Sequence, residues 1–204
     1  MCFSPPFDVK CKTLLGLAKS RIKFLRNKRE GQLKQMKQEL ASFLKARQEP
    51  SAHLKVEQIH REQKIMAAYE VINLFCEQIV TQLPIIKVQK QCPIDLREAI
   101  ASIIYAAPRC SDIPELKKIG GLLSAKYGKE FTTAAAELSQ DNGVNRVVIE
   151  KLSISWPSME IKMKLMIDIA AEQGLDWDPT DLKSQVLMPH EDVLTMRVKQ
   201  HKYG

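Results

Sequence analysis

The residues of this chain whose types could support catalysis or metal binding are few and widely spaced. His53 and His60 lie two helical turns apart and would share a helix face, but no H-E-x-x-H pattern or third ligand accompanies them. Asp176-x-Asp178-x-Thr180 has the form of a phosphotransferase motif, but it follows a helix stop at Gly174 instead of the buried strand that such a nucleophile needs. We therefore expect no metal site and no catalytic centre.

Glycine and cysteine patterns point to no cofactor either. Gly120-Gly121 stands outside any phosphate-binding pattern and follows no strand, so a nucleotide site is not expected. The five cysteines form no C-x-x-C pair and are odd in number, which favours a reducing compartment. The segment from Met1 to Ser20 carries charges where a signal peptide would be apolar. We expect a cytoplasmic protein that is not an enzyme and binds no cofactor.

The strongest chemical signal is an excess of positive charge at the start of the chain. Residues 1–64 hold 15 Lys and Arg against 6 Asp and Glu, a net charge of +9, whereas residues 65–204 hold 16 against 18, a net charge of −2. Between Lys10 and Lys37 the only acidic residue is Glu30. The cations that we expect to bind an anionic membrane or an acidic partner are Lys19, Arg21, Lys23, Arg26, Lys28, Arg29, Lys34 and Lys37. A merely solvated helix face is the alternative.

These cations lie in a segment whose apolar residues recur with the period of an α-helix. The spacing predicts one helix over residues 9–48, weakened at Gly31, and a second over residues 52–83, with a break at Glu49-Pro50-Ser51. Two long helices joined by a short turn must lie antiparallel. The stripes expected to meet are Tyr69, Ile72, Cys76 and Ile79 on the second helix and Ile22, Leu25, Met36 and Leu40 on the first.

Shorter helices are expected after this hairpin, and no segment alternates as a strand would. Asp95 and Glu98 have the spacing of a capping box, which would open a helix over residues 96–107 that ends at Pro108. Further helices are expected over residues 114–138, 144–152 and 157–173. The predicted fold class is all-α.

Several motifs, taken together and in order, make the chain resemble the Ist1-like family of ESCRT-III-related proteins, closest to its plant-type members. They are Lys55–Glu62, Ile104–Arg109, Glu115-Leu116, Lys126–Phe131, Val144-Asn145, Lys151–Ser153 and the segment from Pro157 to Asp178. The resemblance implies an ESCRT-III-like core, a long antiparallel αα-hairpin with shorter helices packed against it. We expect this domain to span residues 9–178, between a flexible tail over residues 1–8 and a partly disordered tail over residues 179–204.

The resemblance also implies a non-enzymatic role in endosomal multivesicular-body sorting and protein transport. Family members bind a charged multivesicular-body protein, which is an ESCRT-III subunit, and modulate the AAA ATPase that disassembles ESCRT-III polymers. They act peripherally on anionic endosomal membranes, and a homo- or hetero-polymer is a further possibility. Within the motifs, the candidate partner-binding residues are Glu57, Arg61, Tyr105 and Arg109. The alternative for Ile104–Arg109 is a packing role, with Tyr105 buried and Arg109 paired to an acid.

Three questions stay open in the sequence. Family members commonly end in a helix that docks the ATPase, but Asp181-Leu182 and Asp192–Leu194 are only fragments of that pattern, so direct contact with the ATPase is undecided. Cys2 or Cys11 could carry a reversible acyl chain, with an unmodified thiol as the alternative. A basic helical nucleic-acid-binding module would use the same cations, although the first helix offers few aromatic side chains to stack on bases.

Overall fold

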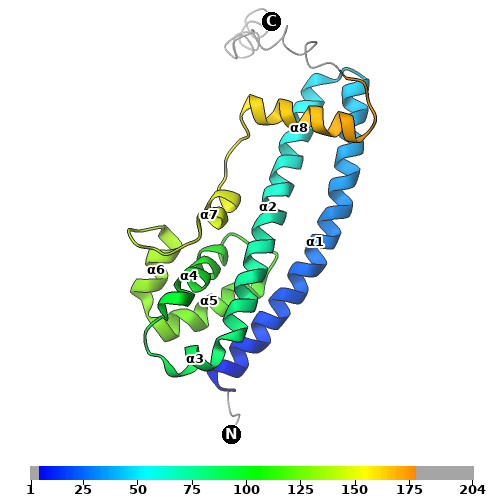
Figure 1. Ribbon diagram of the computed structural model, residues 1–204. Coiled ribbons are helices and arrows are strands. Elements are labelled where there is room, and N and C mark those ends of the chain that lie inside the picture. The colour runs from blue at the N-terminus through cyan, green and yellow to red at the C-terminus, as the bar shows by residue number, and fades with distance from the viewer. Residues whose placement is uncertain (1–4, 178–204) are drawn as a thin grey trace, which may run out of the picture. The chain divides into compact units, whose positions relative to one another are not determined.

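The structure is a computed structural model that describes residues 5–177 (Figure 1). Its helices are α1 (Phe7–Lys45), α2 (Glu49–Thr81), α3 (Leu83–Val88), a 3₁₀-helix (Ile94–Leu96), α4 (Arg97–Ala106), α5 (Pro114–Tyr127), α6 (Lys129–Glu137), α7 (Arg146–Leu152) and α8 (Met159–Glu172). No β-strand occurs among the described residues, and the all-α prediction is confirmed. The described residues form two compact units, one made of residues 5–34 and 59–156, the other of residues 35–58 and 157–177. The predicted tail at 179–204 lies outside the described residues.

The turn between the two long helices comes earlier than predicted. It occupies Ala46–Gln48, where Arg47 has a φ of +53° and the amide of Gln48 donates to the carbonyl of Phe43 at 2.9 Å. Glu49-Pro50 opens α2 instead of breaking the chain, because a proline in the first helical turn forfeits no hydrogen bond. Gly31 is no weak point either, since α1 runs through it without interruption.

In the first unit, α1 and α2 run antiparallel and side by side (Figure 1). Tyr69, Ile72, Cys76 and Ile79 are buried in one cluster with Ile22, and Leu25 packs at the edge of that cluster, as the stripes predicted. For Met36 and Leu40 the prediction was wrong. Both belong to the second unit, where Leu40 is buried.

The centre of the first unit is α4, a helix that is apolar nearly all round. Residues 99–106 are all buried, and α5, α6 and α7 pack against the helix. The predicted capping box is wrong, because Asp95 lies in the 3₁₀-helix and no side chain caps α4. Glu98 instead accepts a hydrogen bond from the side-chain amide of Asn145 at 2.9 Å.

Asn145 fixes the start of α7 onto α4. Its side-chain oxygen accepts hydrogen bonds from the backbone amides of Val147 and Val148. Its backbone N–H donates to the buried hydroxyl of Ser102 at 3.0 Å. The helix therefore begins at Arg146, two residues later than predicted.

The single helix predicted over residues 114–138 is two helices, α5 and α6. Gly128 separates them with a φ of +93°, a backbone conformation that residues with a Cβ rarely adopt. The short α3, with Pro84 in its first turn, was not predicted because the periodicity of α2 runs directly into it.

In the second unit, α8 crosses the helical segments on either side of the α1–α2 turn (Figure 1). Its buried residues are Met166, Ile169 and Ala170. Ser158 caps the helix, and three ion pairs join the segments of this unit: Lys37–Glu172, Lys55–Glu39 and Lys162–Glu57. Among residues 5–177, no helix combines the length and apolar character that crossing a bilayer requires.

Candidate functional site

Five of the eight cations predicted to face an anionic partner are engaged in ion pairs within the chain. These pairs are Lys19–Glu77 at 3.1 Å, Arg21–Glu115 at 2.7 Å, Arg26–Glu70, Arg29 with both Glu62 and Asp112, and Lys37–Glu172 at 2.7 Å. The sequence showed a single opposing charge because the partners come from other segments, namely α2, α5, α8 and the loop before α5. The cationic run on α1 is thus largely neutralised by the fold.

Arg29 anchors the most connected of these groups. It donates to Glu62 on α2 and to Asp112 at 2.8 Å, and its guanidinium lies 5.6 Å from the centre of the Tyr69 ring. Asp112 also accepts a hydrogen bond from the Tyr69 hydroxyl. Burial would raise the pKa of Asp112, but the hydrogen bonds from Tyr69 and Arg29 outweigh it and lower that pKa. This group joins α1, α2 and the loop before α5, so its role is structural.

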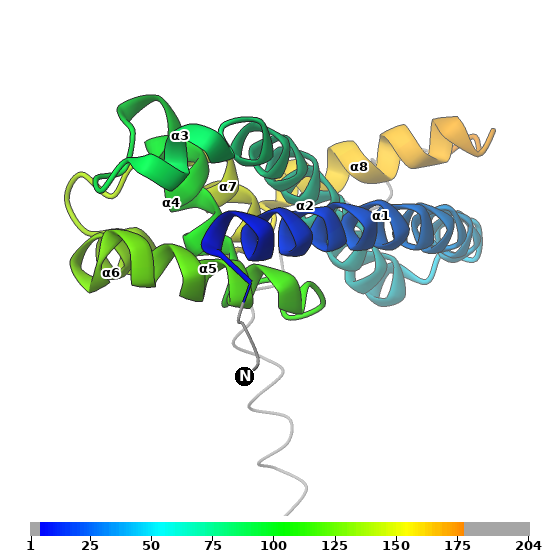
Figure 2. The same cartoon turned by 90° about the horizontal axis from the view of Figure 1, so that it is seen from below.

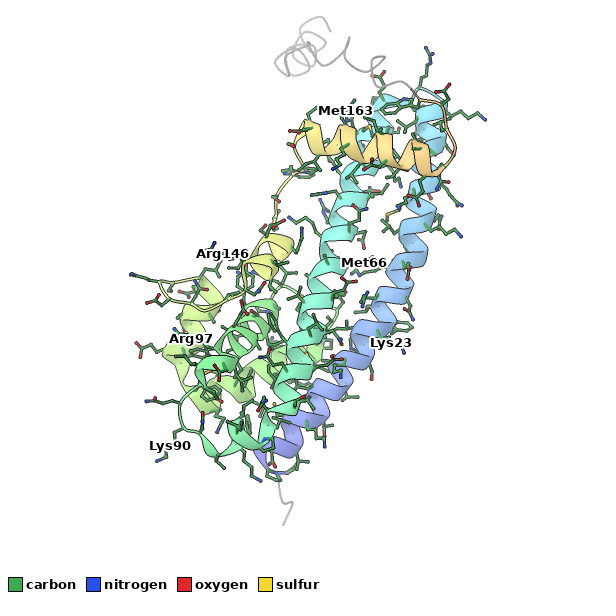
Figure 3. All side chains as sticks on the ribbon, viewed as in Figure 1. Lys23, Met66, Lys90, Arg97, Arg146 and Met163 are labelled. Carbon is green, nitrogen blue, oxygen red and sulfur yellow. The ribbon has the colours of Figure 1, made fainter. Side chains whose placement is uncertain are left out.

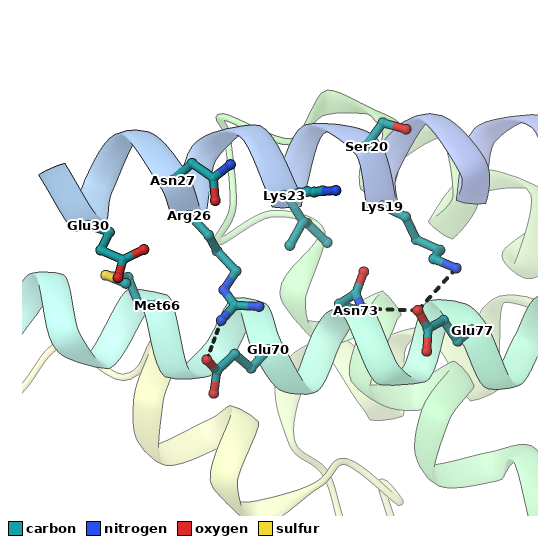
Figure 4. Close-up of a pocket in the computed structure, with 11 residues that line it drawn as sticks. Lys19, Ser20, Lys23, Arg26, Asn27, Glu30, Met66, Glu70, Asn73 and Glu77 are labelled. Carbon is teal, nitrogen blue, oxygen red and sulfur yellow. Dashed lines mark hydrogen bonds and ion pairs between the residues drawn. The ribbon is translucent and has the colours of Figure 1, made fainter.

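Between α1 and α2 lies a groove of about 660 Å³, here called the α1–α2 groove (Figure 4). Its charged lining residues are Lys19, Lys23, Arg26, Glu30, Glu70 and Glu77. Figure 4 shows the pairs Arg26–Glu70 and Lys19–Glu77 bridging the two helices. Three cations face three carboxylates, so the groove has no net charge and offers no preference for an anionic ligand.

Three of the predicted cations make no ion pair among the described residues. Lys23, Lys28 and Lys34 are all exposed, and Figure 3 labels Lys23 on α1. Lys23 and Lys34 are spaced by three helical turns and so share one side of α1, whereas Lys28 lies on another. These three lysines are what remains of the predicted cationic surface.

On the opposite flank of α1 lies a groove of different character, here called the α1–α5 groove. Figure 2 shows α5 alongside the first turns of α1. The groove has a volume of about 320 Å³ and is lined by Pro5, Val9, Lys10, Thr13, Leu14, Lys118 and Leu122. Its bed is apolar, and Lys10 and Lys118 are its charged residues, so it combines apolar surface with positive charge.

Two large, exposed apolar side chains on α1 continue the apolar surface beyond the groove. Leu17 and Phe24 are 52% and 66% exposed and are one heptad apart. Leu17 is eight residues from Val9, so the three side chains lie on the outward side of α1. The sequence reasoning missed this second row because it followed the stripe that forms the core. Its seven-residue spacing was the signal that could have revealed it.

The four candidate partner-binding residues prove to have contacts within the chain. Tyr105 is 3% exposed and belongs to the core, which favours the packing role for its motif. Arg109 stacks on the Tyr105 ring at 3.6 Å and donates to the carbonyls of Tyr105 and Ala136, so the expected pairing with an acid is wrong. Glu57 pairs with Lys162, and the exposed Arg61 stacks on Trp156.

Histidine and cysteine chemistry has no support in the described residues. No cluster of His, Cys, Asp and Glu there could hold a metal ion. Burial raises the pKa of the Cys11 thiol to about 11, and the side chain is fully buried, so acylation of Cys11 is inconsistent with the fold. Cys2 lies outside the described residues.

Comparison with known proteins supplies the family. The Ist1 family, described as regulator of Vps4 activity in the MVB pathway, matches residues 12–176. The chain belongs to the Ist1 family. Among similar Ist1 proteins, the IST1-like protein of Dictyostelium discoideum is 32% identical over 190 residues, which cover 92% of this chain and 51% of that relative. The vacuolar protein sorting-associated protein IST1 of Saccharomyces cerevisiae is 26% identical over 173 residues, covering 81% of this chain and 57% of the yeast protein.

A solved structure has the same fold. It is the crystal structure of the S. cerevisiae Ist1 N-terminal domain in complex with the Did2 MIM motif, with a TM-score of 0.78 and 24% identity, covering 86% of this chain and 96% of that one. The ESCRT-III-like architecture expected from the motifs is therefore confirmed. The chain spans about half the length of the Dictyostelium and yeast relatives.

Proposed function

We propose that this chain is a non-enzymatic adaptor of the multivesicular-body pathway that binds the C-terminal segment of a charged multivesicular-body protein in the α1–α5 groove. Through that complex it modulates the AAA ATPase that disassembles ESCRT-III polymers. It acts on the cytoplasmic side of endosomes, where Lys23 and Lys34 contact anionic lipid from one side of α1 and Lys28 adds positive charge on another.

The observation that carries this proposal is the chemistry of the α1–α5 groove. Val9, Leu14 and Leu122 provide an apolar bed, and Lys118 stands beside it as an exposed cation. An amphipathic helix with apolar residues on one face and carboxylates beside them would match such a groove. The row continues along α1 to Leu17 and Phe24, and the distance from Val9 to Phe24 is about 22 Å, enough for roughly four turns of a bound helix.

Membership of the Ist1 family supports the choice of partner. The related yeast domain was crystallised with a MIM motif of Did2, so a short peptide motif is a reasonable ligand for this fold. The alternative of a nucleic-acid-binding module has weaker support, because five of the eight cations on which it depends are paired within the chain.

The assignment of the α1–α5 groove as the peptide site can be tested by placing negative charge among its lining residues. Val9→Asp and Lys118→Glu, made together, should weaken binding of a C-terminal peptide from a charged multivesicular-body protein by at least about tenfold, measured by fluorescence anisotropy. Leu74→Asp is the matched control, because Leu74 is 61% exposed on α2 and lies outside the groove. Equal affinities of the groove variant and the control would exclude the α1–α5 groove as the peptide site.

The lipid contact is tested separately. Changing Lys23, Lys28 and Lys34 to Glu should abolish sedimentation with phosphatidylserine vesicles at low salt. Changing Lys90, Lys117 and Lys129 to Glu alters the net charge equally at exposed positions elsewhere and should reduce sedimentation far less. Equal loss in both variants would mean that net charge, not a defined surface, drives the interaction. Retention of RNA in preference to vesicles would support the nucleic-acid alternative.

A further inference from the structure

The segment that follows α7 exposes two large apolar side chains in an otherwise polar stretch. Ser153 and Ser158 bound it and both have extended backbone conformations. Between them, Ile154 is 100% exposed and Trp156 is 69% exposed. Ile154 and Trp156 are two residues apart outside any helix and are both exposed, so they make one exposed apolar pair.

This pair is held in place by two cations of α2. Lys64 donates to the carbonyl of Ser153 at 3.0 Å and to the hydroxyl of Ser155 at 2.8 Å. The guanidinium of Arg61 lies 5.6 Å from the centre of the Trp156 ring. The exposed pair is therefore fixed to a helix by its polar neighbours and is already organised for contact.

The surroundings of the pair carry net positive charge. Arg61 and Lys64 contact this segment, Lys151 lies just before it in the chain, and Glu150 pairs with Lys151. Burial, together with the charges of Lys64 and Lys151, lowers the pKa of His60, consistent with a cationic local field. An anionic surface therefore fits this field better than a neutral or basic one does.

We propose that residues 153–156 are a membrane-contact element, in which Ile154 and Trp156 enter the interfacial layer of an anionic bilayer while Arg61 and Lys64 face the headgroups. Tryptophan favours that layer because its ring is apolar and its N–H can reach water or headgroups. Isoleucine contributes apolar area, and the cations complement anionic lipid. This contact involves other residues than Lys23, Lys28 and Lys34, and it adds a hydrophobic component to their electrostatic attraction. The inference rests on the membrane association of the proposed function.

The chain provides its own probe for the test. Its two tryptophans are Trp156 and Trp177, so the full chain carrying Trp177→Phe reports on Trp156 alone. Addition of vesicles containing phosphatidylcholine and phosphatidylserine should shift the Trp156 emission to the blue, and brominated lipid should quench it. Vesicles of phosphatidylcholine alone should change it much less. Ile154→Asp should weaken vesicle partitioning by about tenfold.

Ile94→Asp is the matched control, since Ile94 is 84% exposed at a different place and its replacement should leave partitioning unchanged. Vesicle binding with unaltered Trp156 emission would overturn the membrane-contact element while leaving the proposed function intact. Absence of any vesicle binding would overturn both. A blue shift that depends on protein concentration without lipid, together with dimer formation in sedimentation, would show that the pair contacts a second copy of the chain and would overturn the lipid assignment.

Discussion

The two grooves beside α1 differ in how their charges are balanced. The α1–α2 groove is rich in charge, but its three cations are matched in number by three carboxylates, and Lys19 and Arg26 form ion pairs across it. The α1–α5 groove has fewer charges, yet its apolar bed and Lys118 have no such compensation in the lining. The comparison teaches that a count of cations along a sequence does not locate a binding surface. What matters is which cations the fold leaves without a carboxylate.

The largest expected effect concerns the core beneath the α1–α2 groove. Ile72 is fully buried in the cluster that joins the two helices. Ile72→Asp would bury an uncompensated carboxylate and should lower the free energy of unfolding by about 3–5 kcal/mol, measured by urea denaturation. Leu74→Asp, on the same helix but exposed, should cost far less. Similar stability of the two variants would mean that the contact between α1 and α2 does not depend on this stripe.

A smaller, pH-dependent effect is expected at Asp112. Its pKa is lowered in the folded state from the usual 3.8, so its charge stabilises the fold above that pH, and the stabilisation is lost as the pH falls through the folded value. Asp112→Asn should cost about 1–2 kcal/mol at pH 7 and much less at a pH below the folded pKa of Asp112, which itself lies under 3.8, because the folded wild-type carboxyl then also holds a proton. Urea denaturation at both pH values measures this, and a cost that does not change with pH would contradict the charge-based role.

The smallest effect is expected for the exposed pair Lys19–Glu77 in the α1–α2 groove. The two side chains are 35% and 48% exposed, so solvent screens their attraction. A double-mutant cycle with Lys19→Ala and Glu77→Ala should give a coupling energy of about 0.5 kcal/mol or less. A coupling well above 1 kcal/mol would show that this groove is a structural element and not a solvated one.

The helices themselves were largely predictable, and the reasons for the errors are local. Periodicity located α1, α2, α4, α7 and α8 to within a few residues, because each buries one face or all of its surface. It could not show that Gly128 adopts a positive φ, that α4 has no side-chain cap, or that Asn145 caps α7, because these depend on backbone geometry and on tertiary hydrogen bonds.

The candidate site was less predictable than the fold. Ion pairs such as Arg21–Glu115 join residues far apart in the sequence, so one-dimensional charge counting overestimated the free cationic surface. The α1–α5 groove needs Leu122 and Val9 in proximity, which no local pattern reveals. The exposure of Trp156 was equally hidden, because a tryptophan in sequence reads first as a core residue.

The nearly all-apolar surface of α4 has a consequence for the nascent chain during synthesis. Residues 99–106 are synthesised before α5, α6 and α7, the helices that pack against them. At about 5–20 residues per second, several seconds pass before Leu152 completes that cover. During this interval residues 99–106, which are mostly apolar, lack the helices that cover them in the fold, and exposed apolar segments of this kind are prone to aggregate. The first unit is therefore open to aggregation until α7 has been made, although residues 99–106 are all buried in the finished fold.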